Sequence, residues 1–139
     1  MHYKRILGID YGDVRVGLAQ TDLLQMIASP LETIKNEDEE ALLSYIANLA
    51  KSNDVEKIVV GLPLNIDGSI GERAEITYRF GEKLKQATGL EIIFQDERLS
   101  SFEAEELLKE AKVNSKKQKS LIDKLSACII LEDYLNERG

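Results

Sequence analysis

Carboxylates close two apolar stretches of the sequence. Asp10 follows the apolar residues 6–9, and Asp96 with Glu97 follows a second apolar run over residues 92–94. In α/β proteins, ligands collect at the carboxyl ends of the sheet strands. If these strands are parallel, their carboxyl ends lie at one edge of the sheet, where Asp10 would meet either Asp96 or Glu97. Only one of those two can face Asp10, because neighbouring side chains point to opposite faces of a strand.

A third carboxylate, Asp123, opens a helical pattern and shares a helix face with Ser126, Ala127 and Ile130. An acid on a largely apolar face is costly unless it is paired or metal-bound, although the helix dipole also favours an acid in a first turn. Three carboxylates suit Mg²⁺ or Mn²⁺, which take oxygen ligands and keep places for water and substrate phosphate. Such sites catalyse phosphodiester displacement without histidine or cysteine.

Composition narrows the class of protein. The chain has 139 residues, which predicts one domain over residues 1–139. Its only histidine is His2 and its only cysteine is Cys128, so a histidine-based triad or zinc site is disfavoured and an internal disulfide is excluded. It lacks a signal peptide and a run of about 20 apolar residues, so we expect a cytoplasmic protein outside the membrane.

A net charge of −7 argues against broad nucleic-acid binding, but basic residues are concentrated locally. A lysine-rich connector adjoins Asp123 and could form a basic patch beside the acids, where it would bind a nucleic-acid backbone. The alternative interpretation of this connector is a solvated loop. Arg73 is a further phosphate-contact candidate. We expect five residues to contact substrate: Arg15, Asn65, Arg98, Lys116 and Lys117.

The elements that would position these residues follow from hydrophobic periodicity. The pattern predicts strands over residues 3–10, 16–21, 29–34, 57–61 and 91–95, and helices from Asn36 to about residue 50 and over residues 71–87, 100–111 and 115–137. Pro30 places the third strand at a sheet edge. This order predicts an α/β protein, a mixed sheet with helices on its faces.

Several residues have structural alternatives. The loop over residues 61–68 is glycine-rich enough for a nucleic-acid backbone to approach, while Asn65 and Asp67 could equally serve turn chemistry. We assign Tyr3, Phe94 and Tyr134 to the core. Cys128 is expected to be a small buried apolar residue.

Four blocks resemble, in order and over nearly the whole chain, the YqgF/RuvX family of Holliday junction resolvase-like nucleases. They are residues 8–12 (GIDYG) with 15–19 (RVGLA), 61–68 (GLPLNIDG), 96–100 (DERLS) and 122–123 (ID).

The resemblance implies an RNase H-like three-layer fold, in which helices flank a five-stranded mixed sheet and the first strand lies beside the fourth. It implies that Asp10, Glu97 and Asp123 are the catalytic and metal-binding acids, leaves Asp96 open, and implies Mg²⁺ or Mn²⁺ as cofactor. It also implies a cytoplasmic nuclease that processes the 5′ end of pre-16S rRNA, with ribosomal precursor particles as a further partner.

Three alternatives stay open. One is a Holliday junction resolvase acting on branched DNA, for which a symmetric substrate would suggest a homodimer, whereas a single RNA end would suit a monomer. Another is a non-catalytic RNA-binding module of ribosome assembly, which metal-dependent cleavage would exclude. The third is a phosphotransferase related to actin-like ATPases, which place nucleotide between two domains, whereas this chain has room for one.

Overall fold

The computed structural model describes residues 3–97 and 115–138, with side chains in the second range described from Lys119 onward. The predicted helix over residues 100–111 therefore lies outside the described residues. The other predicted strands and helices are present, with ends shifted by a few residues. They are β1 (Arg5–Tyr11), β2 (Arg15–Thr21), β3 (Ala28–Lys35), α1 (Glu39–Ser52), β4 (Val55–Leu62), α2 (Glu72–Thr88), β5 (Glu91–Asp96) and α4 (Ser115–Arg138).

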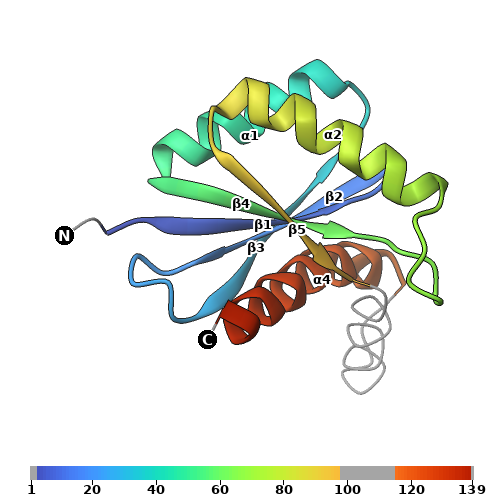
Figure 1. Ribbon diagram of the computed structural model, residues 1–139. Coiled ribbons are helices and arrows are strands. Elements are labelled where there is room, and N and C mark those ends of the chain that lie inside the picture. The colour runs from blue at the N-terminus through green and yellow to red at the C-terminus, as the bar shows by residue number, and fades with distance from the viewer. Residues whose placement is uncertain (1–2, 98–114, 139) are drawn as a thin grey trace.

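The five strands form one mixed sheet in the order β3-β2-β1-β4-β5 (Figure 1). β1, β2 and β3 are antiparallel neighbours, whereas β1, β4 and β5 are parallel. The first strand therefore lies beside the fourth, and Pro30 lies in an edge strand, as predicted. The parallel arrangement brings the carboxyl ends of β1, β4 and β5 to one edge, at the right of Figure 1.

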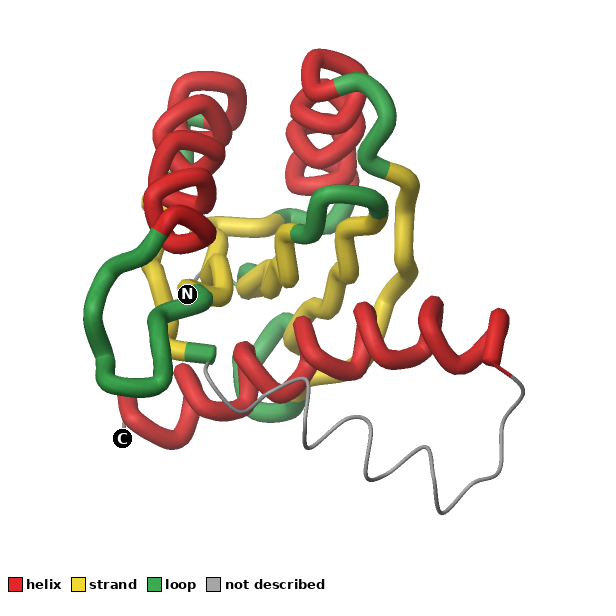
Figure 2. Tube along the Cα trace, turned by 90° about the vertical axis from the view of Figure 1, so that its right-hand side faces the viewer, coloured by secondary structure: helices red, strands yellow, loops and turns green. Residues whose placement is uncertain are grey.

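Helices cover both faces of the sheet and give the predicted three-layer α/β architecture. Figure 2 shows α1 and α2 on one side of the sheet and the long α4 on the other. Leu7 and Ile9 of β1 pack in the core beneath α1 and α2, while Ile6 belongs to the core beneath α4. Because strand side chains alternate, Asp10 faces α4. None of the helices in the described ranges has the length and apolar character needed to cross a membrane.

The first helix begins later than predicted. Asp38, not Asn36, caps α1, because its carboxylate accepts the backbone N–H groups of Glu40 at 3.0 Å and Ala41 at 3.4 Å. The Asn36 side-chain amide instead donates to the Gly12 carbonyl at 2.8 Å. Asn36 thus ties the end of β3 to the turn that follows Asp10.

The core assignment of Tyr3 is wrong. Tyr3 precedes β1 and is 53% exposed, so its ring lies outside both cores. Phe94 and Tyr134 are partly buried against the two cores, as predicted. Cys128 is buried in the core beneath α4, which confirms its structural assignment.

Candidate active site

Asp10 lies near the carboxyl end of the central strand β1, on the face of the sheet that α4 covers. Its partner across the sheet is Gly17 of β2, and the Ile9–Val60 register places Gly61 of β4 on its other side. The pKa of Asp10 is raised to about 6, chiefly by burial, with a further contribution from the charge of Asp123. Hydrogen bonding to Glu97 and the charge of Arg73 oppose this rise. Asp10 is therefore a carboxylate that is poorly solvated.

Glu97 directly follows β5 and faces Asp10. Its backbone N–H donates to the Leu62 carbonyl at 3.2 Å, which extends the pairing of β5 with β4. Ile93 packs in the core beneath α4, and Gln95 bonds to Glu137 of α4. Because side chains alternate along a strand, Glu97 lies on the same face of the sheet and Asp96 on the other.

The side chains of Glu97 and Asp10 share a hydrogen bond. Burial, the charge of Asp10 and this hydrogen bond raise the pKa of Glu97 to about 9. The hydrogen bond lowers the pKa of Asp10 and raises that of Glu97, which is the effect expected where a protonated Glu97 donates to the carboxylate of Asp10. Two acids in contact share one proton because their charges repel in a poorly solvated place.

Asp123 reaches the same edge from α4. The Nε of Arg15 donates to Asp123 Oδ2 at 2.6 Å, and the Asp123 side chain is 16% exposed. The Thr33 hydroxyl donates to the Ser120 carbonyl at 2.6 Å and ties this end of α4 to β3. Asp123 is near enough to Asp10 for its charge to raise the Asp10 pKa. The three predicted acids therefore lie at one edge of the sheet.

Glycines allow α4 to approach the sheet at this edge. A Cβ on Gly17 would lie 1.9 Å from the Asp123 carbonyl oxygen, and one on Gly8 would lie 3.0 Å from the Ala127 carbonyl oxygen. Both obstacles are helix backbone, which cannot rotate away as a flexible side chain could. The placement of Asp123 therefore depends on the absence of a side chain at Gly17.

We expect Gly17→Ala to destabilise the protein by about 2–3 kcal/mol, since it overfills a tight contact, and to weaken Mn²⁺ binding by displacing Asp123. Urea unfolding and calorimetric titration of Mn²⁺ would measure the two effects. Gly89→Ala is the matched control, because Gly89 has φ 71° and an added methyl group there would meet no atom within 4 Å. It should cost about 1 kcal/mol through backbone strain and leave Mn²⁺ binding unchanged. Equal effects of the two variants would contradict the expectation.

Gly61 does not offer the predicted space for a nucleic-acid backbone. It lies within β4, and a Cβ there would come within 2.4 Å of Ile130 Cδ1 and 2.6 Å of Glu97 Oε2. The protein itself fills that space, so the prediction is wrong for this residue. Gly61 instead makes room for the carboxyl group of Glu97.

The other predicted substrate contacts are only partly described. Asn65 serves the turn: its backbone N–H and its side-chain amide donate to Ser69, at 3.0 and 2.9 Å. Asp67 also accepts from Ser69, through both the backbone N–H and the hydroxyl. Arg98 and the side chains of Lys116 and Lys117 lie outside the described residues.

Two further residues are relevant to this site: Arg73 acts on the acids through its charge, and Ser126 lies one turn after Asp123 on α4. Arg73, in the first turn of α2, binds Asp13 at 2.5 Å and lowers the pKa of both Asp10 and Glu97 through its charge. Ser126 follows Asp123 by one turn, and its fully buried hydroxyl has no hydrogen-bond partner among the described residues. Ser126 shares a helix face with Asp123 in the sequence pattern, which by itself predicts no role for it.

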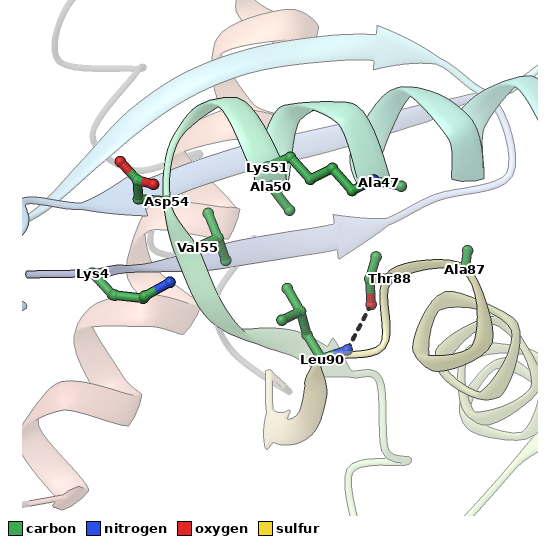
Figure 3. Close-up of a pocket in the computed structure, with 9 residues that line it drawn as sticks. All are labelled: Lys4, Ala47, Ala50, Lys51, Asp54, Val55, Ala87, Thr88 and Leu90. Carbon is green, nitrogen blue, oxygen red and sulfur yellow. Dashed lines mark hydrogen bonds between the residues drawn. The ribbon is translucent and has the colours of Figure 1, made fainter. Parts of the chain in front are cut away.

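A hollow of about 310 Å³ lies at the opposite edge of the sheet (Figure 3). Its lining includes Lys4, Val55 and Leu90, which stand at the amino ends of the three parallel strands. The Thr88 hydroxyl in its wall accepts the Leu90 backbone N–H at 3.2 Å. Its one acid, Asp54, has no second carboxylate beside it in the lining. Within the described part of the chain, this hollow therefore lacks the paired acids found at the carboxyl edge.

The donor set at that edge fits a hard divalent cation. The side chains of Asp10 and Glu97 meet and offer carboxylate oxygens, the ligands that Mg²⁺ and Mn²⁺ prefer. One turn after Asp123, α4 also carries the buried Ser126 hydroxyl, which has no partner among the described residues. In the described arrangement, residues 3–97 and 119–138 contain no group of three acidic, histidine or cysteine side chains able to hold one ion. Arg15 holds the third acid, Asp123. Asp10 and Glu97 are therefore the pair best placed to bind Mg²⁺ or Mn²⁺.

The fold matches solved resolvase structures. RuvC of T. thermophilus in complex with a Holliday junction substrate aligns with a TM-score of 0.58 at 15% identity, covering 98% of this chain and 96% of RuvC. The Fowlpox virus resolvase in complex with Holliday junction DNA aligns with a TM-score of 0.59 at 11% identity, covering 96% and 98% of the two chains. At these identities the likeness concerns the fold, which is RNase H-like.

Sequence comparison identifies the family within that fold class. The sequence profile of RuvX, described as a Holliday junction resolvase, matches residues 4–137. Proteins of Bacillus cytotoxicus and Bacillus thuringiensis, each named "Putative pre-16S rRNA nuclease", are 44% identical over 136 residues, which cover 96% of this chain and 99% of each relative. The chain belongs to the RuvX family.

Proposed function

We propose that this protein is a Mg²⁺- or Mn²⁺-dependent endonuclease that processes the 5′ end of pre-16S rRNA in the cytoplasm. The observation that carries the proposal is the meeting of the Asp10 and Glu97 side chains, with Asp123 beside them, at the carboxyl ends of the parallel strands. The names of relatives that are 44% identical over nearly their whole length support the RNA substrate. Ribosomal precursor particles are the corresponding larger partner.

In this proposal Asp10 and Glu97 hold the cation, and Asp123 completes the acidic set. A divalent ion bound there would act as a Lewis acid that activates water and stabilises the leaving oxygen of a phosphodiester. The two residues are partly buried, which lowers the local dielectric and strengthens the interaction of their carboxyl groups with a cation.

Cationic side chains would hold the substrate backbone. Arg15 and Arg73 lie beside the acids and offset their negative charge, which lets a phosphodiester approach. Asn65 projects from the loop after β4, at the same edge of the sheet. We assign further backbone contacts to the residues predicted from the sequence: Arg98, Lys116 and Lys117.

Cleavage of branched DNA is the second candidate, because the family profile is described as a Holliday junction resolvase. Metal-binding acids of this kind serve the cleavage of both RNA and DNA, so the acidic residues by themselves do not distinguish the two substrates. A homodimer would suit a symmetric junction, and a monomer would suit a single RNA end.

A direct test compares end-labelled pre-16S RNA carrying its 5′ leader with a labelled four-way DNA junction, each in Mg²⁺, Mn²⁺ or EDTA. We expect endonucleolytic cuts in the RNA leader with either cation and none in EDTA. Cleavage of the junction alone would favour the second candidate. Tight RNA binding without cleavage in either cation would overturn the nuclease proposal and identify an RNA-binding module.

A further inference from the structure

Arg15 forms an ion pair inside the candidate site and leaves much of its hydrogen-bonding capacity unused. Its Nε donates to Asp123 Oδ2 at 2.6 Å, and its side chain is 36% exposed. Among the described residues, its two terminal nitrogens have no hydrogen-bond partner. A guanidinium carries five N–H donors in a planar fork that matches a phosphate. Arg15 can therefore bind a second anion from the solvent side.

Asp123 needs a cation when no metal is bound. Its side chain is 16% exposed, so water solvates it poorly, and its charge disfavours ionisation of Asp10. Arg15 supplies that cation in the free protein. While Asp123 is held in this way, the described residues offer no group of three acids able to hold one metal ion.

We propose that Arg15 is an exchangeable counter-ion: it holds Asp123 in the free protein and moves to a substrate phosphate when Asp123 becomes a ligand of the divalent cation. This inference rests on the proposed nuclease function. The exchange gives Asp123 a new cation and gives the guanidinium a new anion, so neither charge is left unpaired. It also couples the two ligands, since cation binding frees Arg15 for the nucleic acid and the reverse holds equally.

A simpler role would have the opposite consequence. If Arg15 only orients Asp123 for metal binding, its removal should weaken the binding of the cation. If Arg15 competes with the cation for Asp123, its removal should strengthen that binding. The sign of the change therefore separates a counter-ion from a positioning residue.

The first measurement is calorimetric titration of Mn²⁺ into the full chain without nucleic acid. We expect Arg15→Gln to bind Mn²⁺ about tenfold more tightly than the unmodified protein, a typical coupling between two sites. Arg79→Gln is the matched control, because it removes the same charge from an exposed position on α2 and should change nothing. In an Asp123→Asn background, Arg15→Gln should lose its effect.

The second measurement is RNA binding by fluorescence anisotropy, in EDTA and in Ca²⁺, with RNA integrity checked on a gel. We expect Arg15→Gln to weaken RNA binding about tenfold in Ca²⁺ and by a much smaller factor in EDTA. Nuclear magnetic resonance supplies an independent readout. The Arg15 Nε–H should exchange slowly with solvent in metal-free protein and faster after addition of Mg²⁺.

The outcomes are distinguishable. Weaker or unchanged Mn²⁺ binding by Arg15→Gln, or an effect that persists in the Asp123→Asn background, would overturn the exchange. If the unmodified protein still cleaved RNA in that case, the proposed function would stand. Failure of the unmodified protein to bind Mn²⁺ would overturn both.

Discussion

The Asp10→Asn variant is expected to lose at least about a thousandfold of its metal-dependent cleavage rate while keeping its fold. Asparagine has nearly the shape of aspartate, so it fits between Gly17 and Gly61 in the same sheet row. It removes the anionic oxygen that would bind the cation, and loss of metal-ion stabilisation costs several kcal/mol in the transition state. Cleavage of labelled RNA under single-turnover conditions would measure the change.

Asp54→Asn is the matched control for this variant. It makes the same chemical change at the opposite edge of the sheet, where Asp54 lines the hollow shown in Figure 3. Asp54 has φ 54°, a left-handed conformation that asparagine tolerates. The control should cleave normally. Full activity of a folded Asp10→Asn protein would remove Asp10 from the mechanism.

The second large effect concerns stability and pH. In metal-free protein, the pKa values of Asp10 and Glu97 are raised to about 6 and about 9 from ordinary values of 3.8 and 4.5. Below the ordinary values both groups are protonated in the folded and unfolded states, and the full stability is present. As pH rises, the unfolded chain releases these protons first, so stability falls until the folded-state values are passed. The metal-free protein should therefore weaken between about pH 4 and pH 9, with the contribution of Glu97 lost between about pH 4.5 and pH 9.

Glu97→Gln should remove most of this loss. Glutamine cannot ionise, and its amide can still donate to the carboxylate of Asp10. We expect its stability relative to the unmodified protein to rise by up to about 1.4 kcal/mol per pH unit across this range. Urea unfolding in EDTA at about pH 5, 6, 7 and 8 would measure the slope.

Two controls accompany this measurement of stability against pH. Glu82→Gln removes the same charge from an exposed position of α2 and should show no such slope. Saturating Mg²⁺ should stabilise the unmodified protein most at high pH, where both carboxyl groups can ionise to bind it. A stability difference between Glu97→Gln and the unmodified protein that stays constant with pH would show that the two acids do not share a proton.

Much of the fold was predictable because local patterns agreed with the tertiary structure. The short apolar runs ending on Asp10 and Asp96 are typical of buried strands that open into loops, and the glycine at position 89 is typical of a helix end. The cap of α1 was misplaced, because Asn36 and Asp38 are both good caps and only the observed hydrogen bonds choose between them. Tyr3 was misassigned because its aromatic character favours burial, whereas its exposure depends on tertiary packing before the start of β1.

Residue types and their order along the chain were enough to predict an α/β protein, its family and the three acids Asp10, Glu97 and Asp123. Those features are local, since they depend on side-chain chemistry and on the periodicity of neighbouring residues. Only the tertiary structure decided that Glu97 meets Asp10, that Gly17 and Gly61 make room for Asp123 and Glu97, and that Arg15 holds Asp123. These contacts join residues far apart in the chain, and their distances are determined by strand register and by how closely α4 approaches the sheet.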